Sequence, residues 1–222
     1  MRLKREFFNR NTVLVAQELL GKFLVRKIGD KIIRARIIET EAYCGTKDLA
    51  CHASKGLTER TKVMFGPAGF SYVYMIYGMY HCLNVVTEKR GNPSAVLIRA
   101  VVIQNAKIKT QNDSSFDKPV DNRLRKSVIH RFEFKNKLNG PGILCRELRI
   151  DRKLNAVDLT KSKLLWIEDP APSFSADRHK GADLVRGKRS WSKLLCLKIK
   201  VGKRIGVDYA GKWKDKPWRF YF

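Results

Sequence analysis

The sequence lacks several features that would assign it to a protein class at once. No two cysteines are spaced as CxxC, and the cysteines number five, at positions 44, 51, 82, 145 and 196. An odd, scattered set argues against a disulfide scaffold or a zinc ribbon and fits a reducing compartment. The pairs Cys51–His52 and His81–Cys82 match no familiar ligand spacing, so we expect no metal site.

Long apolar runs are also missing. No stretch reaches about 18 apolar residues, the length that a membrane helix needs, so we expect no membrane span. Residues 1–22 lack the apolar centre of a signal peptide. Because nothing resembles a targeting segment, two locations stay open: the cytoplasm of a bacterium, with nucleoid association, or the nucleus of a eukaryote.

Acidic residues are scarce. The chain has 21 Asp and Glu against 46 Lys and Arg, which gives a net charge of +25. Such an excess favours a polyanionic partner, with nucleic acid ahead of a membrane surface, although a general lysine bias of the proteome would also produce it. Hydrophobic residues make up 44%, which excludes a disordered chain, and 222 residues suffice for one sizeable core.

Periodicity and turn residues predict a mixed chain. We expect a helix over 13–20, capped by Asn11 or Thr12 and ended by Gly21. A second helix is expected from about 143, and a third near 124–134. Strands are expected at 22–28, 31–43, 70–76, 80–86, 94–103, 161–168 and 194–200.

Neither repeats nor a linker divide the chain. We therefore expect one α+β domain spanning 1–222, with a curved, mostly antiparallel β-sheet flanked by helices. Two polar, basic segments, near 104–137 and 171–193, are interpreted as insertions in this domain.

The stretch KIIRARIIETEAY at 31–43 places carboxylates on an apolar strand. Side chains two residues apart share a face, so one face should carry Ile33, Ala35, Ile37, Glu39, Glu41 and Tyr43. A carboxylate beside an aromatic ring at a strand end can activate water as a general base. A surface salt bridge is the simpler interpretation, and spacing alone does not choose between the two glutamates.

Arg99 and His52 are further candidates. Arg99 is the only charge in the apolar stretch 94–103, and a guanidinium there needs an acidic or hydrogen-bonding partner. It could orient Glu41 or a water, or it could be purely structural. His52 could bind a ligand, although a loop histidine is more often bonded only to its neighbours.

The stretch FSYVYMIYGMYHCLNVV at 70–86 is rich in tyrosine. Aromatic rings along a β surface can stack on nucleic-acid bases. Tyr77, beside Gly78 at a predicted turn and close to Met79, could enter a base step as a wedge. On this stretch alone, a hairpin whose tyrosines pack a core is the favoured interpretation.

Taken together, these segments resemble the alkyladenine (3-methyladenine) DNA glycosylase family. The pair ETEAY and YVYMIYGMYHCLN is highly specific, and the matching segments cover most of the chain. In chain order they are EFF at 6–8, ELLGK at 18–22, RIIETEAY at 36–43, ACHASKGLTERTKVMFGPAG at 50–69, YVYMIYGMYHCLN at 72–84, VLIRA at 96–100, NGPGILC at 139–145, RIGV at 204–207 and PWRFY at 217–221.

The resemblance implies a base-excision-repair enzyme. Such an enzyme flips alkylated or deaminated purines out of duplex DNA and hydrolyses the N-glycosidic bond with an activated water, without cofactor or metal. The implied substrates are 3-methyladenine, 7-methylguanine, hypoxanthine and ethenoadenine. Damaged double-stranded DNA is the implied partner, and we expect a monomer.

The resemblance also implies a role for each candidate residue. Glu41 matches the base that activates the water, and Arg99 the residue that helps hold this water. Tyr43, His52 and Tyr74 match the residues that form the walls of the pocket for the flipped base. Asn84 matches the residue at the pocket floor with which the amino group of guanine would collide. Tyr77 matches the side chain that fills the gap in the duplex, with Met79 beside it.

Two positions depart from the family pattern. Thr61, in TERT, replaces an asparagine, and Ile143, in GPGIL, replaces a lysine. The first affects the hydrogen bonds of a loop, and the second removes one expected phosphate contact, for which Lys137 and Arg146 are nearby replacements. These departures keep a second hypothesis open, a catalytically weak DNA- or RNA-binding protein on the same fold.

Overall fold

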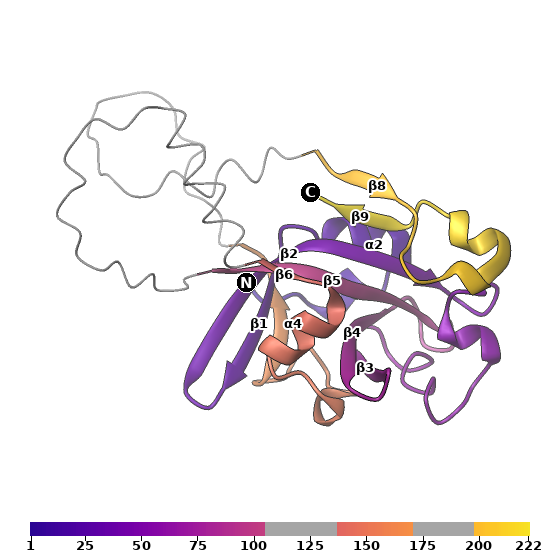
Figure 1. Cartoon of the computed structure of the whole chain (residues 1–222). Helices are drawn as coiled ribbons and strands as arrows, with labels where there is room; N and C mark the ends of the chain where they lie inside the picture. The colour runs from indigo at the N-terminus through magenta and orange to yellow at the C-terminus, as the bar shows by residue number, and fades with distance from the viewer. Residues whose placement is uncertain (105–136, 171–197) are drawn as a thin grey trace, which may run out of the picture.

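The computed structural model describes residues 1–104, 137–170 and 198–222 (Figure 1). The two expected insertions lie almost wholly outside the described residues. The helix expected near 124–134, most of the strand expected at 194–200, and Cys196 also lie outside them.

An antiparallel sheet forms the framework of the described chain (Figure 1). Its strands are neighbours in the order β3–β4–β5–β2–β1–β7; β6 pairs with β5, and β9 pairs with both β2 and β8. Every pairing is antiparallel. The bounds are β1 Phe23–Ile28, β2 Lys31–Cys44, β3 Ser71–Ile76, β4 Tyr80–Thr87, β5 Ser94–Gln104, β6 Lys137–Asn139, β7 Leu165–Glu168, β8 Lys200–Gly202 and β9 Arg219–Tyr221.

Helices cover parts of this sheet. The α-helices are α1 Arg5–Phe8, α2 Thr12–Glu18 and α4 Pro141–Glu147, and the 3-10 segments are η1 His52–Lys55, η2 Arg152–Leu154 and η4 Asp208–Asp215. Helix α2 packs on β2 and β5, and α4 packs on β4 and β5. The α+β class and the curved, mostly antiparallel sheet expected from the sequence are confirmed.

The first predicted helix forms for the predicted reason. The Asn11 side chain accepts the N–H groups of Val13 and Leu14, which satisfies two donors that have no partner inside α2. Val15 and Ala16 are fully buried against the sheet. The cap and the apolar face together therefore fix this helix.

Strand β2 changes face part-way along its length. Ala35 and Ile37 belong to the main hydrophobic core. The register with β5 then shifts between Ile37 and Glu39 and again between Glu39 and Thr40. Ile38 has no partner in this register, so it acts as the extra residue of a β-bulge.

The bulge corrects the prediction that Ile33, Ala35 and Ile37 share a face with Glu39, Glu41 and Tyr43. Beyond it, Thr40 and Ala42 face the core: Thr40 Oγ1 donates to the Ala16 carbonyl at 2.7 Å, and Ala42 is a core residue. One extra residue reverses the alternation of a strand. The two glutamates therefore lie on the opposite face of the sheet from Ala35 and Ile37.

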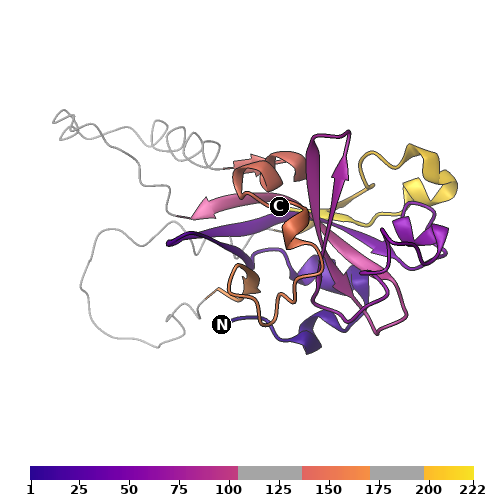
Figure 2. The same ribbon diagram turned by 90° about the horizontal axis from the view of Figure 1, so that it is seen from below.

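The β3–β4 hairpin confirms the predicted turn. Ile76 pairs with Tyr80, which leaves Tyr77, Gly78 and Met79 as its tip. Tyr77 has φ 51°, and its side chain is 85% exposed. Figure 2 shows this hairpin projecting from the body of the molecule.

Three element boundaries differ from those expected. Strand β7 begins at Leu165, because the backbone N–H groups of Lys161 and Ser162 bind the Asp158 carbonyl and form a turn where strand was expected. Strand β8 begins at Lys200. Helix α4 begins at Pro141, since proline is suited to the first helical position.

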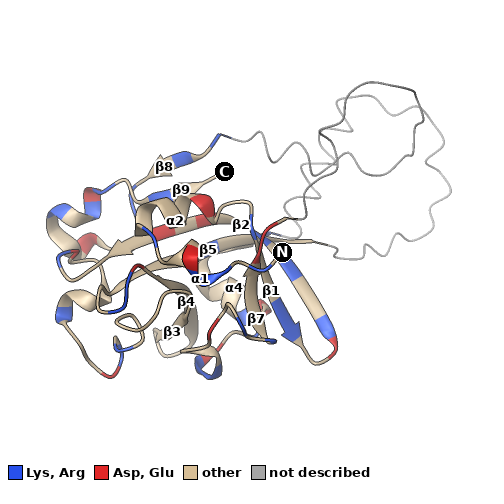
Figure 3. Cartoon of the chain, turned by 180° about the vertical axis from the view of Figure 1, so that it is seen from behind, with Lys and Arg blue, Asp and Glu red and all other residues tan. Residues whose placement is uncertain are grey.

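Basic residues are distributed over several surfaces. Figure 3 shows lysine and arginine on the β1–β2 hairpin and on β8. Within the described part of the chain, no helix is long and apolar enough to cross a membrane. Cys44, Cys51, Cys82 and Cys145 are free thiols.

Candidate active site

A cavity of about 320 Å³ opens between the β3–β4 hairpin, the face of β2 and β5 that carries Tyr43 and Arg99, and the segment after β8. Six of the eight site residues expected from the sequence line it: Tyr43, His52, Tyr74, Tyr77, Asn84 and Arg99. The other two, Glu41 and Met79, do not. The structure therefore gathers most of the predicted set around one hollow.

Aromatic rings form one wall of the cavity. The His52 and Tyr74 rings lie edge to face with centroids 4.5 Å apart, and Tyr72 and Tyr74 lie 5.3 Å apart. His52 Nδ1 and the Tyr72 hydroxyl are 2.9 Å apart, within hydrogen-bond distance. The wall is thus held by ring contacts and by a hydrogen bond between η1 and β3.

His52 stays uncharged in this wall. Burial lowers its pKa, and the charges of Arg60 and Lys55 lower it further, to about 4. An imidazole with that pKa is neutral near pH 7. It therefore presents a flat, uncharged ring to the cavity.

Glu41 lies directly behind the cavity lining. Its side chain is fully buried, and Oε1 accepts the backbone N–H of Ile205 at 2.8 Å. Oε2 accepts the Tyr43 hydroxyl at 2.9 Å and Arg99 Nη1 at 3.3 Å. All three donors belong to cavity-lining residues, so the carboxylate is one hydrogen bond away from the cavity.

The environment raises the pKa of Glu41. Burial is the largest cause, because it disfavours the charged carboxylate; Arg99, the Ile205 N–H and the Tyr43 hydroxyl act in the opposite direction. Nearby Glu39 adds a smaller raising effect. A carboxylate with a raised pKa accepts a proton more readily, which suits a general base.

Arg99 joins the two glutamates of the strand. Its Nε donates to Glu39 Oε1 at 3.2 Å while its Nη1 reaches Glu41. Arg219 of β9 also donates to Glu39 Oε1, at 3.3 Å. Glu39 therefore anchors Arg99, whereas Glu41 is bonded to three cavity-lining residues, a difference that spacing alone did not reveal.

Asn84 lines the cavity, and a hydrogen bond fixes its side chain. The residue is 4% exposed, and Nδ2 donates to the Tyr72 carbonyl at 3.2 Å. That bond holds the amide in one orientation beside the cavity. A rigid polar group of this kind can reject a ligand whose edge does not match it.

Tyr77 and Met79 diverge at the tip of the hairpin. Tyr77 lines the main cavity, whereas Met79 is 68% exposed and lines a second cavity of about 220 Å³ with Tyr80 and Arg149. Gly142 of α4 lies against Tyr80, since a Cβ there would meet the Tyr80 ring at 3.1 Å. The structure therefore places the two tip residues toward different cavities.

The two family departures have different consequences. Thr61 is buried, and its Oγ1 accepts the Thr58 N–H at 2.8 Å and donates to the Gly56 carbonyl at 2.8 Å. The threonine thus makes its own hydrogen bonds within the loop. Ile143, on α4, is 43% exposed and supplies no charge.

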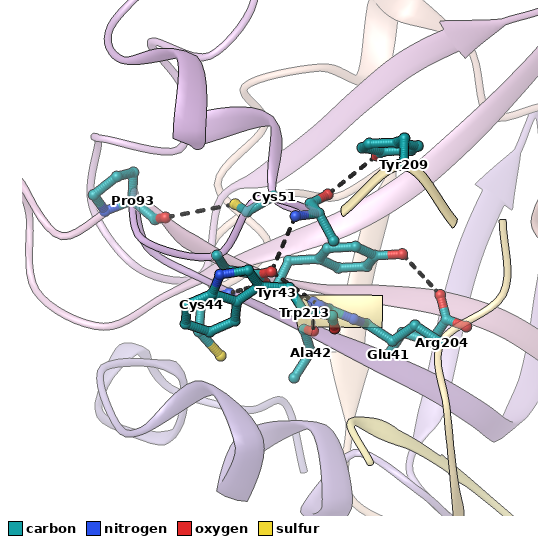
Figure 4. Close-up of polar contacts among 11 residues, drawn as sticks. Glu41, Ala42, Tyr43, Cys44, Cys51, Pro93, Arg204, Tyr209 and Trp213 are labelled. Carbon is teal, nitrogen blue, oxygen red and sulfur yellow. Dashed lines mark hydrogen bonds and ion pairs between the residues drawn. The ribbon is translucent and has the colours of Figure 1, made fainter. Parts of the chain in front are cut away.

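Sequence reasoning missed the segment after β8. Ile205, Gly206, Val207 and Tyr209 line the cavity, although no site role was predicted for any of them. Tyr209 donates its hydroxyl to the Ala50 carbonyl at 3.4 Å, and Figure 4 shows it beside the loop that carries Cys51. The motif RIGV at 204–207 was the available signal.

Arg204 was missed as well. Its guanidinium donates to Asp48 Oδ2 at 2.5 Å and to Oδ1 at 2.9 Å, and both side chains are fully buried. It also donates to the carbonyls of Ala42 and Trp213 at 2.9 Å (Figure 4). Its carbon Cζ lies 4.9 Å from the centroid of the Tyr43 ring.

These residues define what the site can do chemically. The cavity has flat aromatic walls that suit a planar ring, and a buried carboxylate stands beside a guanidinium at its base. Among the described residues, no group of three or more His, Cys, Asp or Glu is placed to hold a metal ion. The described side chains therefore offer acid–base chemistry on a planar ligand.

Comparison of the sequence with known proteins shows which family it matches. A family model described as methylpurine-DNA glycosylase (MPG) matches residues 6–222. A protein of Desulfitobacterium hafniense (strain Y51), named "Putative 3-methyladenine DNA glycosylase", is 43% identical over 223 residues, which cover 99% of this chain and 94% of the relative.

Relatives with the same name occur in other organisms. The one from Legionella pneumophila (strain Lens) is 43% identical over 220 residues, covering 99% of this chain and 93% of the relative. The one from Clostridioides difficile (strain 630) is 39% identical over 222 residues, covering 99% of both chains. The similarity therefore extends over the whole chain, including the segments that build the cavity.

Proposed function

The chain belongs to the methylpurine-DNA glycosylase family, and we propose that it removes alkylated or deaminated purines from duplex DNA by hydrolysing the N-glycosidic bond. The observation that carries the proposal is the buried Glu41 carboxylate, which is hydrogen-bonded to Tyr43, Arg99 and Ile205 behind a cavity lined by aromatic rings. Substrates of the proposed class are 3-methyladenine, 7-methylguanine, hypoxanthine and ethenoadenine.

Glu41 would act on the attacking water. A water at the cavity base, beside Arg99, gives its proton to the Glu41 carboxylate as its oxygen bonds to C1′ of the sugar. The C1′–N bond breaks, and its electron pair leaves with the purine. Because the transition state resembles an oxocarbenium ion, the negative charge of Glu41 also stabilises the sugar.

The aromatic walls would receive the purine after it leaves the helix. Extruding a base costs a few kcal/mol, and damaged bases, which pair poorly, cost least. Stacking on an aromatic ring returns about 1–3 kcal/mol per base. Tyr43, Tyr74 and the neutral ring of His52 provide the faces for this stacking.

Tyr77 would fill the gap in the duplex. It stands at the tip of a projecting hairpin, largely exposed, yet it lines the cavity that receives the base. A side chain so placed can enter the base step as the nucleotide leaves and oppose its return. Met79 would lie beside the gap, toward the second cavity.

Asn84 would exclude normal guanine. Its amide Nδ2 is engaged with the Tyr72 carbonyl, so the group cannot turn to accommodate an additional exocyclic amine. A collision at that edge disfavours guanine relative to hypoxanthine, which lacks the 2-amino group.

The basic surface would hold the DNA backbone. A net charge of +25 supplies lysine and arginine for phosphate contacts. Binding should therefore weaken steeply as salt concentration rises, because each phosphate contact releases condensed counterions.

The direct test is release of free base from duplexes that carry a single hypoxanthine or 7-methylguanine. Glu41→Gln should lower the single-turnover rate by about 10²-fold or more, the range expected for a lost general base. Glu39→Gln is the matched control, because Glu39 also binds Arg99 but makes no hydrogen bond to Tyr43 or Ile205, and it should lose less. Equal rates for Glu41→Gln and the parent protein would remove the catalytic assignment.

The same assay distinguishes the enzyme from a binding protein on this fold. A parent protein that binds damaged duplex and releases no base would be such a binder. Competition with structured RNA would then identify its preferred nucleic acid.

A further inference from the structure

Two of the aromatic rings that line the cavity are each in contact with an arginine guanidinium group. Arg204 lies 4.9 Å from the Tyr43 ring centroid, and Arg60 lies 5.1 Å from the Tyr74 ring centroid. Neither arginine lines the cavity. Each cation therefore acts on the cavity through the ring that it contacts and through its electric field.

Arg204 packs on the Tyr43 ring from outside the cavity lining. Tyr43 lines the cavity, while the Arg204 side chain is fully buried and its other side packs against Trp218 at 5.0 Å. A cation on one face of a ring uses the negative charge of its π-system. The cavity-facing side of Tyr43 is consequently less attractive to a second cation than an isolated tyrosine would be.

The region around His52 gives a separate indication of the local field. Its imidazole stays neutral because of burial first, and then because of the charges of Arg60 and Lys55. A field that disfavours an imidazolium on the cavity wall also disfavours a positively charged purine stacked beside it. Arg99 lines the cavity, and its positive charge pairs with the buried Glu41 carboxylate at 3.3 Å.

We propose that Arg204 and Arg60 set the charge preference of the base pocket, shifting it from cationic purines toward neutral ones. The proposal rests on the glycosylase function proposed above and assigns a specificity role to two residues outside the lining. Purines methylated at N3 or N7 in DNA, such as 3-methyladenine and 7-methylguanine, are cationic, whereas hypoxanthine and ethenoadenine are neutral.

The test compares excision of 7-methylguanine and hypoxanthine from duplexes of the same sequence. The measured quantity is the ratio of the two single-turnover rate constants. The intrinsic lability of each glycosidic bond is the same for every variant, so a change in this ratio between variants reports the pocket alone. Arg60→Gln is the primary variant, because Arg60 is exposed, whereas Arg204 is buried.

Arg60→Gln should raise the ratio of 7-methylguanine to hypoxanthine excision about twofold or more, as expected for an exposed cation–π contact. Lys62→Gln is the matched control: Lys62 is nearby and basic, but it pairs with Glu59 at 2.6 Å. Lys62→Gln removes the same charge from the protein, and its excision ratio should equal that of the parent.

The buried arginine needs a paired comparison. Asp48→Asn breaks the ion pair and keeps the cation on Tyr43, whereas Arg204→Gln/Asp48→Asn removes the cation as well. The double variant should show a ratio about three- to tenfold above that of Asp48→Asn, since a desolvated cation–π contact is stronger than an exposed one.

The outcomes separate the two proposals. If the parent protein releases neither base, the proposed function fails. If it releases both and the ratio is unchanged or lower in Arg60→Gln, the charge-preference proposal is overturned, even where the Arg204 variants do not fold. A higher ratio in Arg60→Gln with an unchanged ratio in Lys62→Gln supports it.

Discussion

The Glu41 carboxylate accepts the backbone N–H of Ile205 at 2.8 Å, although the two residues are 164 positions apart in the sequence. This bond ties the strand that carries the proposed base to the segment that closes the cavity. The next residue toward the N-terminus, Arg204, packs on the Tyr43 ring. One short segment therefore positions both the carboxylate and the stacking ring.

The first prediction concerns the pH dependence of base release. The reaction needs ionised Glu41, whose pKa is raised above its ordinary value of 4.5, so the rate should fall on the acid side with an apparent pKa above 4.5. Arg99 opposes this rise. Arg99→Gln should therefore move the acid limb to higher pH, in single-turnover rates measured over about pH 4–9.

Arg99→Lys is the control for this shift, because it keeps a positive charge near the carboxylate. Its acid limb should lie closer to that of the parent. The pKa of His52 is about 4, below the apparent pKa expected for base release. His52→Gln should therefore leave the apparent pKa of the acid limb unchanged. A limb at the same pH in Arg99→Gln and in the parent would contradict the electrostatic coupling.

A second prediction concerns the hairpin tip. Tyr77→Ala should reduce the fluorescence change of a reporter base next to the lesion, because nothing then fills the vacated step. The side chain is 85% exposed, so the substitution should leave the unfolding midpoint unchanged. Met79→Ala removes an exposed neighbour that lines the other cavity, and it should affect flipping less. Undiminished flipping in Tyr77→Ala would refute the wedge role.

A third prediction concerns the exclusion of guanine. Asn84→Ala removes the fixed amide at the cavity edge, so release of undamaged guanine from duplex DNA should rise above the parent background. Release of hypoxanthine, which has no 2-amino group, should change less. The ratio of the two rates is the measurement, and a ratio equal to that of the parent would show that Asn84 does not discriminate.

The sequence predicted the local features of this site well. The helix cap, predicted at Asn11 or Thr12 and formed by Asn11, and the turn at Tyr77 depend on neighbours within a few positions, and both appear in the structure. Family resemblance implied a role for each of eight site residues, and six of the eight line one cavity.

The sequence could not predict what depends on distant partners. The bulge at Ile38 reverses which residues of β2 face the core, and its position is set by pairing with β5, which strand periodicity does not contain. The stacking of Arg204 on Tyr43 likewise requires the closing segment to fold back onto β2. Because both arise from long-range contacts, composition and spacing carry no signal for them.

The last prediction concerns the buried pair of Arg204 and Asp48. Both side chains are fully buried and joined by two hydrogen bonds, so removing either partner leaves the other charge unpaired in the interior. Arg204→Gln and Asp48→Asn should each lower the free energy of unfolding by about 3–5 kcal/mol, measured by urea denaturation. The double variant should lose clearly less than the sum of the two, because neither charge is then left alone. Additive losses of unfolding free energy would show that Arg204 and Asp48 do not act as a unit.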